Sequence, residues 1–513
     1  MKSSTSAVLK FGGICRRTSV TASKVKLTRS MSSSTYLESV KQKLSSLKTQ
    51  FLFKKGEIDI IYSPSAFYDT LRKKISTARR KIFIASLYIG KSETDLIDCV
   101  RNALEKNSDL KVYFLIDGLR GTREAPLRCS TSLLTELLKD YESRVDIRLY
   151  RTPAIVGLKG LIAPKRINEG LGLQHMKIYG FDDEVLLSGA NLSSDYFSNR
   201  QDRYYLFRSA SFSDYYFKLH QTISKLSYKV KSANNAQKFH VSWPTSNNAI
   251  DPAENRKMFI KHASKVLNDF LNTSSFDNNH HPLHHQDFPT VVYPVSQFTP
   301  LFPRGHDNST EKQSILKLIS SMSISSSRWV FTAGYFNMLP EIKRSLILSS
   351  SKNGTVITAS QFANGFFESK GISAHLPSAY LHLSKLFLEK VKMYGKESVI
   401  TLKEWKKGIV NKPGGWSYHA KGIWISEQES DSFLPVATCI GSSNYTKRAY
   451  SLDLESNAII LTSDMELRGK MQKELDHIMK DTRSVNLEDF RNDTERHVSA
   501  GVKVATKILG TRL

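Results

Sequence analysis

Two segments of this 513-residue chain look like copies of one design. A predicted amphipathic helix over 67–78 runs directly into an apolar strand over 81–88, and a second helix over 312–325 runs into a strand over 329–335. Further strand candidates follow at 111–117, 145–150, 355–359 and 398–402. A chain that repeats helix and strand units in this order is restricted to an α/β fold with two similar halves.

The two copies also end alike, in a His-x-Lys tripeptide. His175 follows Tyr88 by 87 residues, and His419 follows Tyr335 by 84 residues. A duplicated unit explains this agreement better than coincidence. We therefore expect an α/β fold of two lobes, each a mixed sheet flanked by helices.

The duplication divides the chain into five parts. They are a leader at 1–37, an N-terminal lobe at 50–235 with its motif at 175–191, a connection at 236–311, a C-terminal lobe at 312–490 with its motif at 419–444, and a basic tail at 491–513. The connection is rich in Pro, Asn, His and Ser, which predicts one helix over 254–270 with irregular flanks.

The leader carries seven Lys and Arg residues and no acidic residue before Glu38. It is rich in Ser and Thr and lacks a continuous apolar stretch, which is typical of a mitochondrial transit peptide and not of a secretory signal. The alternative is a disordered basic tail.

The formal net charge of +26 indicates polyanionic or anionic-surface partners, so nucleic acid, phosphate esters and acidic lipid all fit. Four scattered cysteines without a C-x-x-C pair disfavour a disulfide framework and structural zinc. No run of 18 apolar residues occurs, so any membrane contact is expected to be peripheral.

The first His-x-Lys motif places its two functional side chains on one face. On a strand, the period of two directs His175 and Lys177 to the same side. A turn at 182–183 then sends the chain back, and the returning strand brings Ser188 and Asn191 towards the pair.

The second motif repeats the arrangement with His419 and Lys421, followed by Ser442 and Asn444 after a longer hairpin. In both halves an acid follows the asparagine by eleven residues; the two acids are Asp202 and Glu455. One His-x-Lys is weak evidence, but two matched constellations are strong evidence for a functional site.

Phosphodiester exchange suits these groups. One neutral imidazole can attack phosphorus, forming a phospho-histidine, while the other, protonated, gives its proton to the leaving oxygen. The lysines and asparagines supply charge and donors to the phosphoryl oxygens without a metal. An acid bonded to the far nitrogen of each imidazole fixes its tautomer, and Asp202 and Glu455 are the candidates.

The H-x-K-x4-D motif of His175, Lys177 and Asp182, doubled at His419 and Lys421, resembles the phospholipase D superfamily. The residues that frame the first motif are similar to those of the eukaryotic mitochondrial phosphatidylglycerophosphate synthases. The resemblance covers about residues 50–490.

The resemblance implies two phospholipase D-like lobes with the active site between them. It implies transfer of a phosphatidyl group from CDP-diacylglycerol to sn-glycerol 3-phosphate, with release of CMP, as the committed step towards cardiolipin. His175 would be the nucleophile and His419 the acid/base. It further implies peripheral attachment to the anionic mitochondrial inner membrane, no nucleic-acid partner, and no required cofactor, with activation by a divalent ion left open. A hydrolase of the same superfamily, a phospholipase or nuclease, and a non-catalytic binding module are the alternatives.

The second motif departs from the pattern, because Ser426 stands where an Asp is expected. Whether Glu427 or Glu429 substitutes is open. The incomplete second motif favours His175 over His419 as the nucleophile.

A second phosphate motif also needs an explanation. Ala85, Gly90, Lys91 and Ser92 fit the relaxed Walker A pattern of an ATP site. Because Ala85 falls inside a predicted strand and not in a glycine-rich turn, a structural role is favoured over nucleotide binding.

Other candidates are weaker. Cations within a strand and loop of the motifs could bind the acceptor phosphate; they are Lys165, Arg166, Arg200, Arg203, Lys447 and Arg448. Four neighbouring histidines in the connection, His280, His281, His284 and His285, are better explained as a solvated cluster than as a metal site.

The tail from Arg496 to Leu513 contains no acidic residue, and an apolar helix face is expected there from Val502, Ala505, Ile508 and Leu509. Both a membrane-surface helix and an ordinary packed terminal helix fit, and the packed helix is favoured.

Fusion of residues 1–37 to a fluorescent reporter tests the leader. We expect the reporter in mitochondria because the segment is basic, Ser-rich and free of acids. A matched fusion with the seven cations changed to Gln should remain in the cytosol, and a cytosolic wild-type fusion would contradict the prediction.

Overall fold

The computed structural model describes residues 35–155, 169–273, 287–323, 327–427 and 433–510. The leader up to Ser34, Lys165, Arg166 and the four histidines of the connection lie outside these residues.

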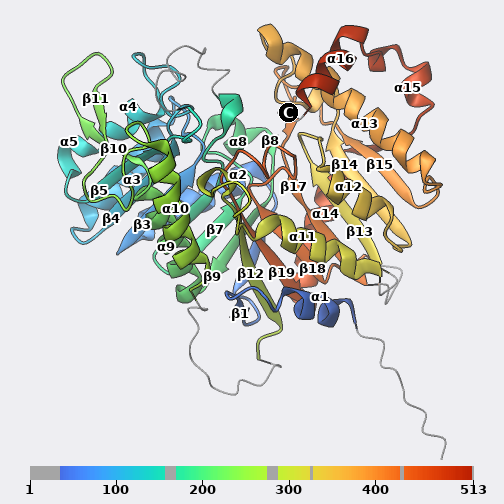
Figure 1. Ribbon diagram of the computed structural model, residues 1–513, viewed down its shortest axis with the longest axis horizontal. Helices are drawn as coiled ribbons and strands as arrows, with labels where there is room; N and C mark the ends of the chain where they lie inside the picture. The colour runs from blue at the N-terminus through green and yellow to red at the C-terminus, as the bar shows by residue number, and fades with distance from the viewer. Residues whose placement is uncertain (1–34, 156–168, 274–286, 324–326, 428–432, 511–513) are drawn as a thin grey trace, which may run out of the picture. The chain divides into compact units, whose positions relative to one another are not determined.

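Two nine-stranded mixed sheets make up the centre of the fold (Figure 1). The N-terminal sheet has the order β11-β10-β5-β4-β3-β6-β7-β9-β2, and the C-terminal sheet has the order β1-β12-β19-β18-β17-β13-β14-β15-β20. Strands β3, β4 and β5 are parallel in one, as β13, β14 and β15 are in the other, and each parallel set continues into antiparallel strands. The shared order confirms the predicted duplication and the α/β fold class.

The strands of the N-terminal sheet are β2 (Ile58–Ile61), β3 (Lys81–Ser86), β4 (Lys111–Asp117), β5 (Val145–Tyr150), β6 (Ile178–Phe181), β7 (Glu184–Ser188), β9 (Tyr204–Arg208), β10 (Tyr228–Ser232) and β11 (Phe239–Ser242). Those of the C-terminal sheet are β1 (Phe51–Phe53), β12 (Thr290–Gln297), β13 (Ser327–Ala333), β14 (Asn353–Ala359), β15 (Ile400–Trp405), β17 (Lys421–Glu427), β18 (Ala437–Gly441), β19 (Glu455–Thr462) and β20 (Thr482–Val485). Two short strands, β8 (Arg200–Gln201) and β16 (Ser417–Tyr418), pair with each other.

The helices pack on both faces of the sheets. They are α1 (Tyr36–Leu44), α2 (Pro64–Thr77), α3 (Thr94–Lys106), α4 (Ser130–Thr135), α5 (Leu138–Tyr141), α8 (Ser194–Ser198), α9 (Ala210–Ser224), α10 (Arg256–Leu271), α11 (Glu311–Ser320), α12 (Pro340–Ile347), α13 (Leu376–Met393), α14 (Met465–Met479), α15 (Asp489–Asn492) and α16 (Ala500–Leu509). No helix among the residues described above is long and apolar enough to cross a membrane.

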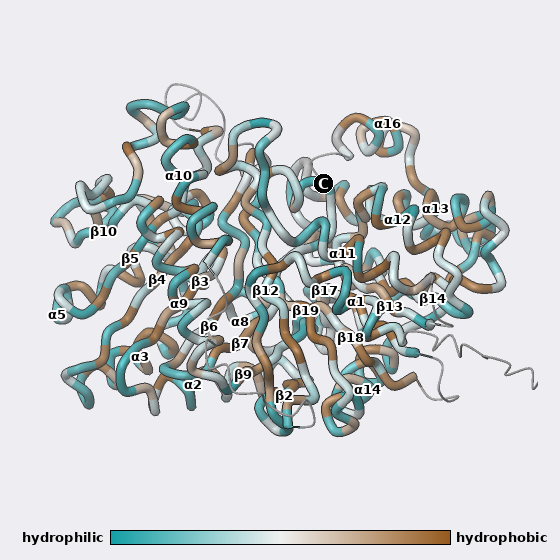
Figure 2. The backbone as a smooth tube through the Cα atoms, turned by 60° about the horizontal axis from the view of Figure 1, so that its bottom comes forward, coloured by the Kyte–Doolittle hydropathy of each residue, from teal (hydrophilic) through white to brown (hydrophobic). Residues whose placement is uncertain are grey.

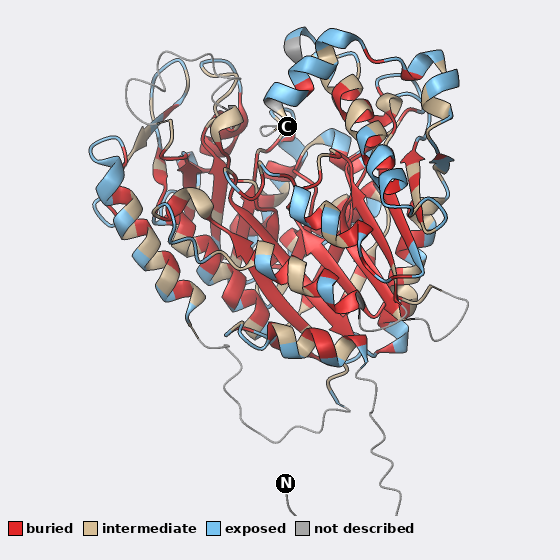
Figure 3. Ribbon diagram, turned by 45° about the vertical axis from the view of Figure 1, so that its right-hand side comes forward, coloured by how far each residue is buried: buried red, intermediate tan, exposed pale blue. Residues whose placement is uncertain are grey.

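Strand β3 shows why these sequences form sheets covered on both sides. Ile82 and Ile84 pack with the α2 and α3 side chains, whereas Phe83 and Ala85 face a core that they share with α9. A strand buried on both faces needs a continuous apolar run, which is what the sequence contains. Figures 2 and 3 show the result, with hydrophobic, buried strands at the centre and exposed residues mainly on the helices.

The predicted connection is more ordered than expected. Its helix is present as α10, but the prediction of irregular flanks was wrong, because β11 joins the N-terminal sheet and β12 joins the C-terminal sheet. Strand β12 was not predicted because it contains Pro294, and proline is unusual within a sheet. It is tolerated because β1 pairs only with residues 290–292 and leaves that edge of β12 uncovered at Pro294.

The first described elements also differ from the predicted lobe boundary at residue 50. Helix α1 and strand β1 belong to the C-terminal lobe, where Tyr36, Val40 and Leu44 enter the core beside Leu318. The Tyr36 hydroxyl donates to the Leu318 carbonyl oxygen at 3.1 Å. The predicted leader at 1–37 therefore overlaps the first residues of α1.

This packing predicts that a chain starting at Thr35 keeps the thermal stability of the full chain, whereas a chain starting at Lys48 melts at a lower temperature. Tyr36→Ala should also lower the melting temperature, because truncation of a buried aromatic side chain costs about 3–5 kcal/mol. Lys41→Ala, on the exposed side of α1, is the matched control. Equal melting temperatures for all four proteins would contradict the assignment of α1 to the core.

Candidate active site

The two His-x-Lys segments each lie against an extended segment from the other lobe. The backbone N–H of His175 donates to the Leu454 carbonyl at 2.9 Å, and that of Leu454 donates to Leu173 at 2.8 Å. In the same way β16 pairs with β8, and the N–H of His419 donates to the Gln201 carbonyl at 2.8 Å. Each histidine is therefore placed directly beside the residue that precedes the other lobe's acid.

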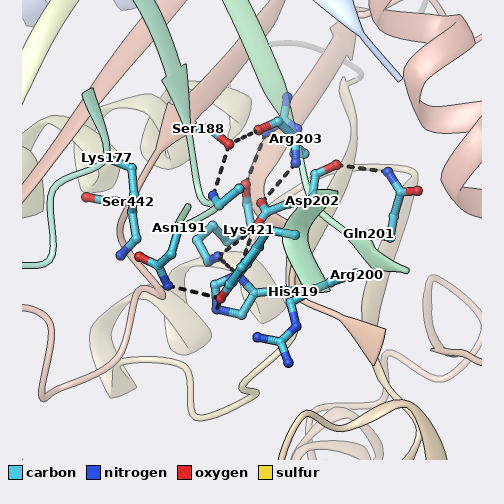
Figure 4. Close-up of polar contacts among 12 residues, drawn as sticks. Lys177, Ser188, Asn191, Arg200, Gln201, Asp202, Arg203, His419, Lys421 and Ser442 are labelled. Carbon is cyan, nitrogen blue, oxygen red and sulfur yellow. Dashed lines mark hydrogen bonds and ion pairs between the residues drawn. The ribbon is translucent and has the colours of Figure 1, made fainter. Parts of the chain in front are cut away.

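Each histidine contacts the acid that belongs to the other lobe. His175 Nδ1 lies 2.9 and 3.1 Å from the two carboxylate oxygens of Glu455. His419 Nδ1 lies 2.6 Å from Asp202 Oδ2 (Figure 4). The sequence spacing identified both acids but not which histidine each would contact. A carboxylate on Nδ1 holds the proton there and leaves Nε2 to meet the substrate.

The two lysines are buried beside their histidines. Lys177 Nζ donates to the His175 carbonyl oxygen at 2.6 Å, and Lys421 Nζ lies 2.7 Å from His419 Nδ1 and 3.4 Å from Asp202 Oδ2. Burial lowers the pKa of Lys177 to about 7 and that of Lys421 to about 8. The site thus concentrates positive charge where water is largely absent, which strengthens its attraction for an anion.

The two histidine–acid pairs differ in charge. Burial raises the pKa of Glu455 to about 7. Burial also acts to raise the pKa of Asp202, but Lys421 and His419 outweigh it, so this pKa lies below its usual value. An ionised Asp202 stabilises a protonated His419 better than a partly protonated Glu455 stabilises a protonated His175.

Burial, reinforced by the adjacent lysine, lowers the pKa of both imidazoles well below the usual range. Without a bound anion both rings are therefore neutral at pH 7. The side chain of His175 is 12% exposed and that of His419 is 5% exposed, so His175 is the more accessible of the two.

The small residues of the motifs are also at the site. Ser442 Oγ donates to a Glu455 carboxylate oxygen, and Asn191 Nδ2 donates to the Tyr196 hydroxyl at 3.2 Å. Among the described residues, the side-chain oxygens of Asn191 and Asn444 are buried without a hydrogen-bond partner. The Ser188 hydroxyl donates to the Arg203 carbonyl at 2.7 Å, and the Ser442 hydroxyl lies 3.3 Å from the matching Ser456 carbonyl.

The structure corrects the role of Asp182. Its carboxylate accepts the backbone N–H groups of Arg79, Arg80 and Lys81 at 2.8–3.0 Å, at the turn beyond the far end of β6. Seven extended residues separate it from His175, roughly 20 Å at about 3.3 Å per residue. Asp182 ties the hairpin to the start of β3 and lies outside the histidine cluster.

The position of Asp182 also explains why the second motif can have Ser426 in place of an Asp. Ser426 is buried in β17, and its hydroxyl donates to the Glu427 carbonyl at 3.1 Å. Because Asp182 does not reach the histidines in the first lobe, the serine at the matching place removes nothing from the site in the second. Ser426 therefore does not distinguish His175 from His419 as the nucleophile, whereas the unequal acids Glu455 and Asp202 do.

The Walker-like residues do not form a phosphate loop. The backbone of Ala85 is paired within β3 with Leu115 on one side and Ile178 on the other. The N–H of Gly90 donates to the Leu192 carbonyl at 2.7 Å, and the space beside Gly90 is filled by the Glu93 side chain. Lys91 and Ser92 follow in the turn before α3. A carboxylate next to the turn opposes a phosphate there.

The candidate acceptor cations separate into two groups. Arg203 is fully buried, and its guanidinium donates to the Glu474 carboxylate at 2.8 and 3.1 Å, so it is not available to a substrate. Lys447 is exposed at the surface. Arg200 lies near His419 and Arg448 near His175, and both contribute to the lowered pKa of those rings.

Two tyrosines at the site were missed. The rings of Tyr196 and Tyr335 pack edge-on against the His419 ring, with centroids 5.2 and 5.3 Å away. The Tyr196 hydroxyl lies 3.4 Å from His419 Nε2. The repeat contained a signal for Tyr335, because it ends the duplicated strand at the position that Tyr88 has in the first lobe. Nothing in the sequence distinguished Tyr196.

Within the described parts of the chain, no group of three or more His, Cys, Asp or Glu side chains is arranged to hold a metal ion.

No protein-family model matches the chain. Curated relatives do. The chain is 56% identical to CDP-diacylglycerol–glycerol-3-phosphate 3-phosphatidyltransferase of Saccharomyces pastorianus, over 97% of this chain and 96% of the relative. It is 30% identical to the human enzyme of that name, marked mitochondrial, over 91% of this chain and 85% of the relative. The chain belongs to this phosphatidyltransferase family.

The fold is also that of a solved structure. Phosphatidylserine synthase of Haemophilus influenzae superposes with a TM-score of 0.68 over 93% of this chain and 97% of its own, at 19% identity. At this identity the likeness shows the fold alone. The curated relatives confirm the family predicted from the motifs, and the solved structure confirms the α/β fold.

In this phosphatidyltransferase, Asp182→Ala should lower the melting temperature but leave the rate of CMP release per folded molecule unchanged, because it removes only backbone contacts worth about 1–3 kcal/mol. Asp202→Asn should instead slow CMP release by about 100-fold or more, because it cannot stabilise a protonated His419. Asp183→Ala is the matched surface control. A large loss of rate in Asp182→Ala with normal stability would restore Asp182 to the site.

Proposed function

We propose that this protein transfers the phosphatidyl group of CDP-diacylglycerol to sn-glycerol 3-phosphate, giving phosphatidylglycerophosphate and CMP. The observation that carries the proposal is the pair of exchanged histidine–acid contacts, each with a buried lysine, in a chain of this family. The site has two imidazoles and fixed positive charge, which is what a two-step displacement at phosphorus requires.

In the first step the Nε2 lone pair of His175 attacks the phosphorus that carries the diacylglycerol. The bond from that phosphorus to the bridging oxygen breaks, and CMP leaves with the electron pair. His419, protonated when the anionic substrate raises its pKa, donates its Nε2 proton to the leaving oxygen. The product is a phosphatidyl-histidine on His175.

In the second step a hydroxyl of glycerol 3-phosphate gives its proton to Nε2 of His419 and attacks the phosphorus. The phosphorus–nitrogen bond breaks and returns its electron pair to His175. Lys177 and Lys421 stabilise the charge on the phosphoryl oxygens in both steps. The ionised Asp202 supports the acid/base role of His419, and the greater exposure of His175 supports its role as the nucleophile.

Arg200 and Arg448 are the residues we propose to hold phosphate groups on either side of the reacting phosphorus. Arg200 stacks over the Tyr196 ring with its guanidinium 4.6 Å from the ring centroid, and its Nε donates to Ser417 at 2.9 Å. Arg448 Nε is held by Asp453 at 3.2 Å, and Asp453 also accepts the backbone N–H of Leu173. Both guanidinium groups are thus oriented beside the histidines before substrate binds.

The proposed setting is the mitochondrial inner membrane, with peripheral attachment, at the committed step towards cardiolipin. The mitochondrial names of the vertebrate relatives and the acid-free leader support the organelle. The large positive charge supports attachment to an anionic lipid surface. No cofactor or nucleic acid is included in the proposal, and a divalent ion could act as an activator.

Purified protein with CDP-diacylglycerol tests the reaction. Without acceptor we expect about one CMP per protein, with the phosphatidyl group retained on His175 after denaturation, and continuous release only with glycerol 3-phosphate. Steady release without acceptor would indicate a hydrolase. His175→Ala should abolish both, and an active His175→Ala would overturn the choice of nucleophile.

The pH profile tests the lysines. As pH rises through about 7 to 8, Lys177 and Lys421 lose their protons in the free enzyme. The value of kcat/KM should therefore fall over this range, because neutral amines no longer stabilise the phosphoryl oxygens. Lys447→Ala, an exposed lysine near the second motif, should leave the profile unchanged. A profile that stays flat to pH 9 would contradict the assignment.

A further inference from the structure

Helix α16 presents two large apolar side chains to solvent. Val504 and Ile508, one turn apart, are 59% and 71% exposed, whereas Thr506, which points into the protein, is 5% exposed. A surface helix that only completes a core shows the reverse arrangement, with its apolar stripe inward. The predicted tail helix is therefore present. Of its predicted apolar face, Ala505 and Ile508 are exposed and Val502 is half-buried, and the Leu509 side chain lies outside what the structure describes.

The same helix is positively charged. Lys503 and Lys507 form a second exposed row next to the apolar one, and α16 contains no acidic residue. Lys503 lies close to His382 on the adjoining helix α13. One turn after His382, Leu386 is a further exposed apolar side chain. An apolar row bordered by lysines is typical of helices that lie in the interface of an anionic bilayer.

The helix is tied to the catalytic site. The side-chain amide of Asn337 donates to the Gly510 carbonyl, directly after α16, at 2.6 Å. Asn337 follows Tyr335 by two residues, and the Tyr335 ring packs on His419. Figure 1 shows α16 beside the first half of α13, where His382 lies, and Figure 3 shows its exposed surface.

We propose that the exposed face of α16, defined by Val504, Ile508, Lys503 and Lys507, together with Leu386 of α13, is the surface that docks this protein on an anionic lipid bilayer. The inference rests on the proposed function, since a diacyl substrate stays in the bilayer while its phosphates must reach the histidines. Val504 and Ile508 enter the level of the lipid head groups, and the two lysines lie among the lipid phosphates.

Vesicle binding by the full chain tests the proposal. Wild-type protein should float with vesicles of phosphatidylcholine and phosphatidylglycerol and much less with phosphatidylcholine alone. Val504→Asp/Ile508→Asp should reduce binding to the anionic vesicles by about 10-fold or more, and Lys503→Gln/Lys507→Gln should reduce it and weaken its dependence on salt. Leu348→Asp, at an apolar position that is 45% exposed directly after helix α12, is the control.

Activity separates this proposal from the proposed reaction. With substrate in detergent micelles, the Val504→Asp/Ile508→Asp protein should release CMP at the wild-type rate; with substrate in anionic vesicles it should be about 10-fold slower. If the wild type is inactive in micelles, the proposed reaction fails, and vesicle binding still decides the docking surface. Wild-type binding by the double variant would overturn the proposal. So would a shift from dimer to monomer in that variant, which would make the face a contact between two copies.

Discussion

Each histidine of this protein is oriented by an acid from the opposite lobe, and the rest of the site depends on that exchange. His175 contacts Glu455, and His419 contacts Asp202. Neither lobe alone contains a complete histidine–acid pair, so each lobe depends on the other to orient its imidazole. The two cross-lobe backbone contacts, at Leu454 and at Gln201, set the distance at which the exchange occurs.

The docking of the lobes is stabilised by a buried charge next to one of these acids. Arg203 extends from the N-terminal sheet into the C-terminal lobe, where it pairs with Glu474 and donates to the Cys439 carbonyl at 2.7 Å. The guanidinium passes over Gly422, where a Cβ atom would lie 1.9 Å from it. A buried cation is stable only when it is paired and fully hydrogen-bonded. Because Asp202 is the preceding residue, the same interaction places the carboxylate that contacts His419.

Local regularities of the chain were predictable. The strands at 111–117 and 145–150 occur at the predicted positions, because continuous apolar runs and short turns specify them locally. The assignments that were wrong depend on distant partners. Strand β12 is stabilised by β19, about 165 residues away, and α1 by the core of the C-terminal lobe. No local pattern reports such pairings.

The site likewise combines features that are predictable from local sequence with features that depend on distant contacts. The sequence by itself determined the duplication, the two His-x-Lys pairs, the asparagines and the two acids at equal spacing, because a repeat preserves residue types and intervals. It could not determine which acid meets which histidine, since linear spacing contains no information on how two lobes dock. Only the tertiary structure shows which acid contacts which histidine, that Asp182 lies outside the cluster, and that Arg203 lies in the core. It also gives Asp202 and Glu455 different pKa values, because burial and neighbouring charge, and not residue type, decide where a proton resides.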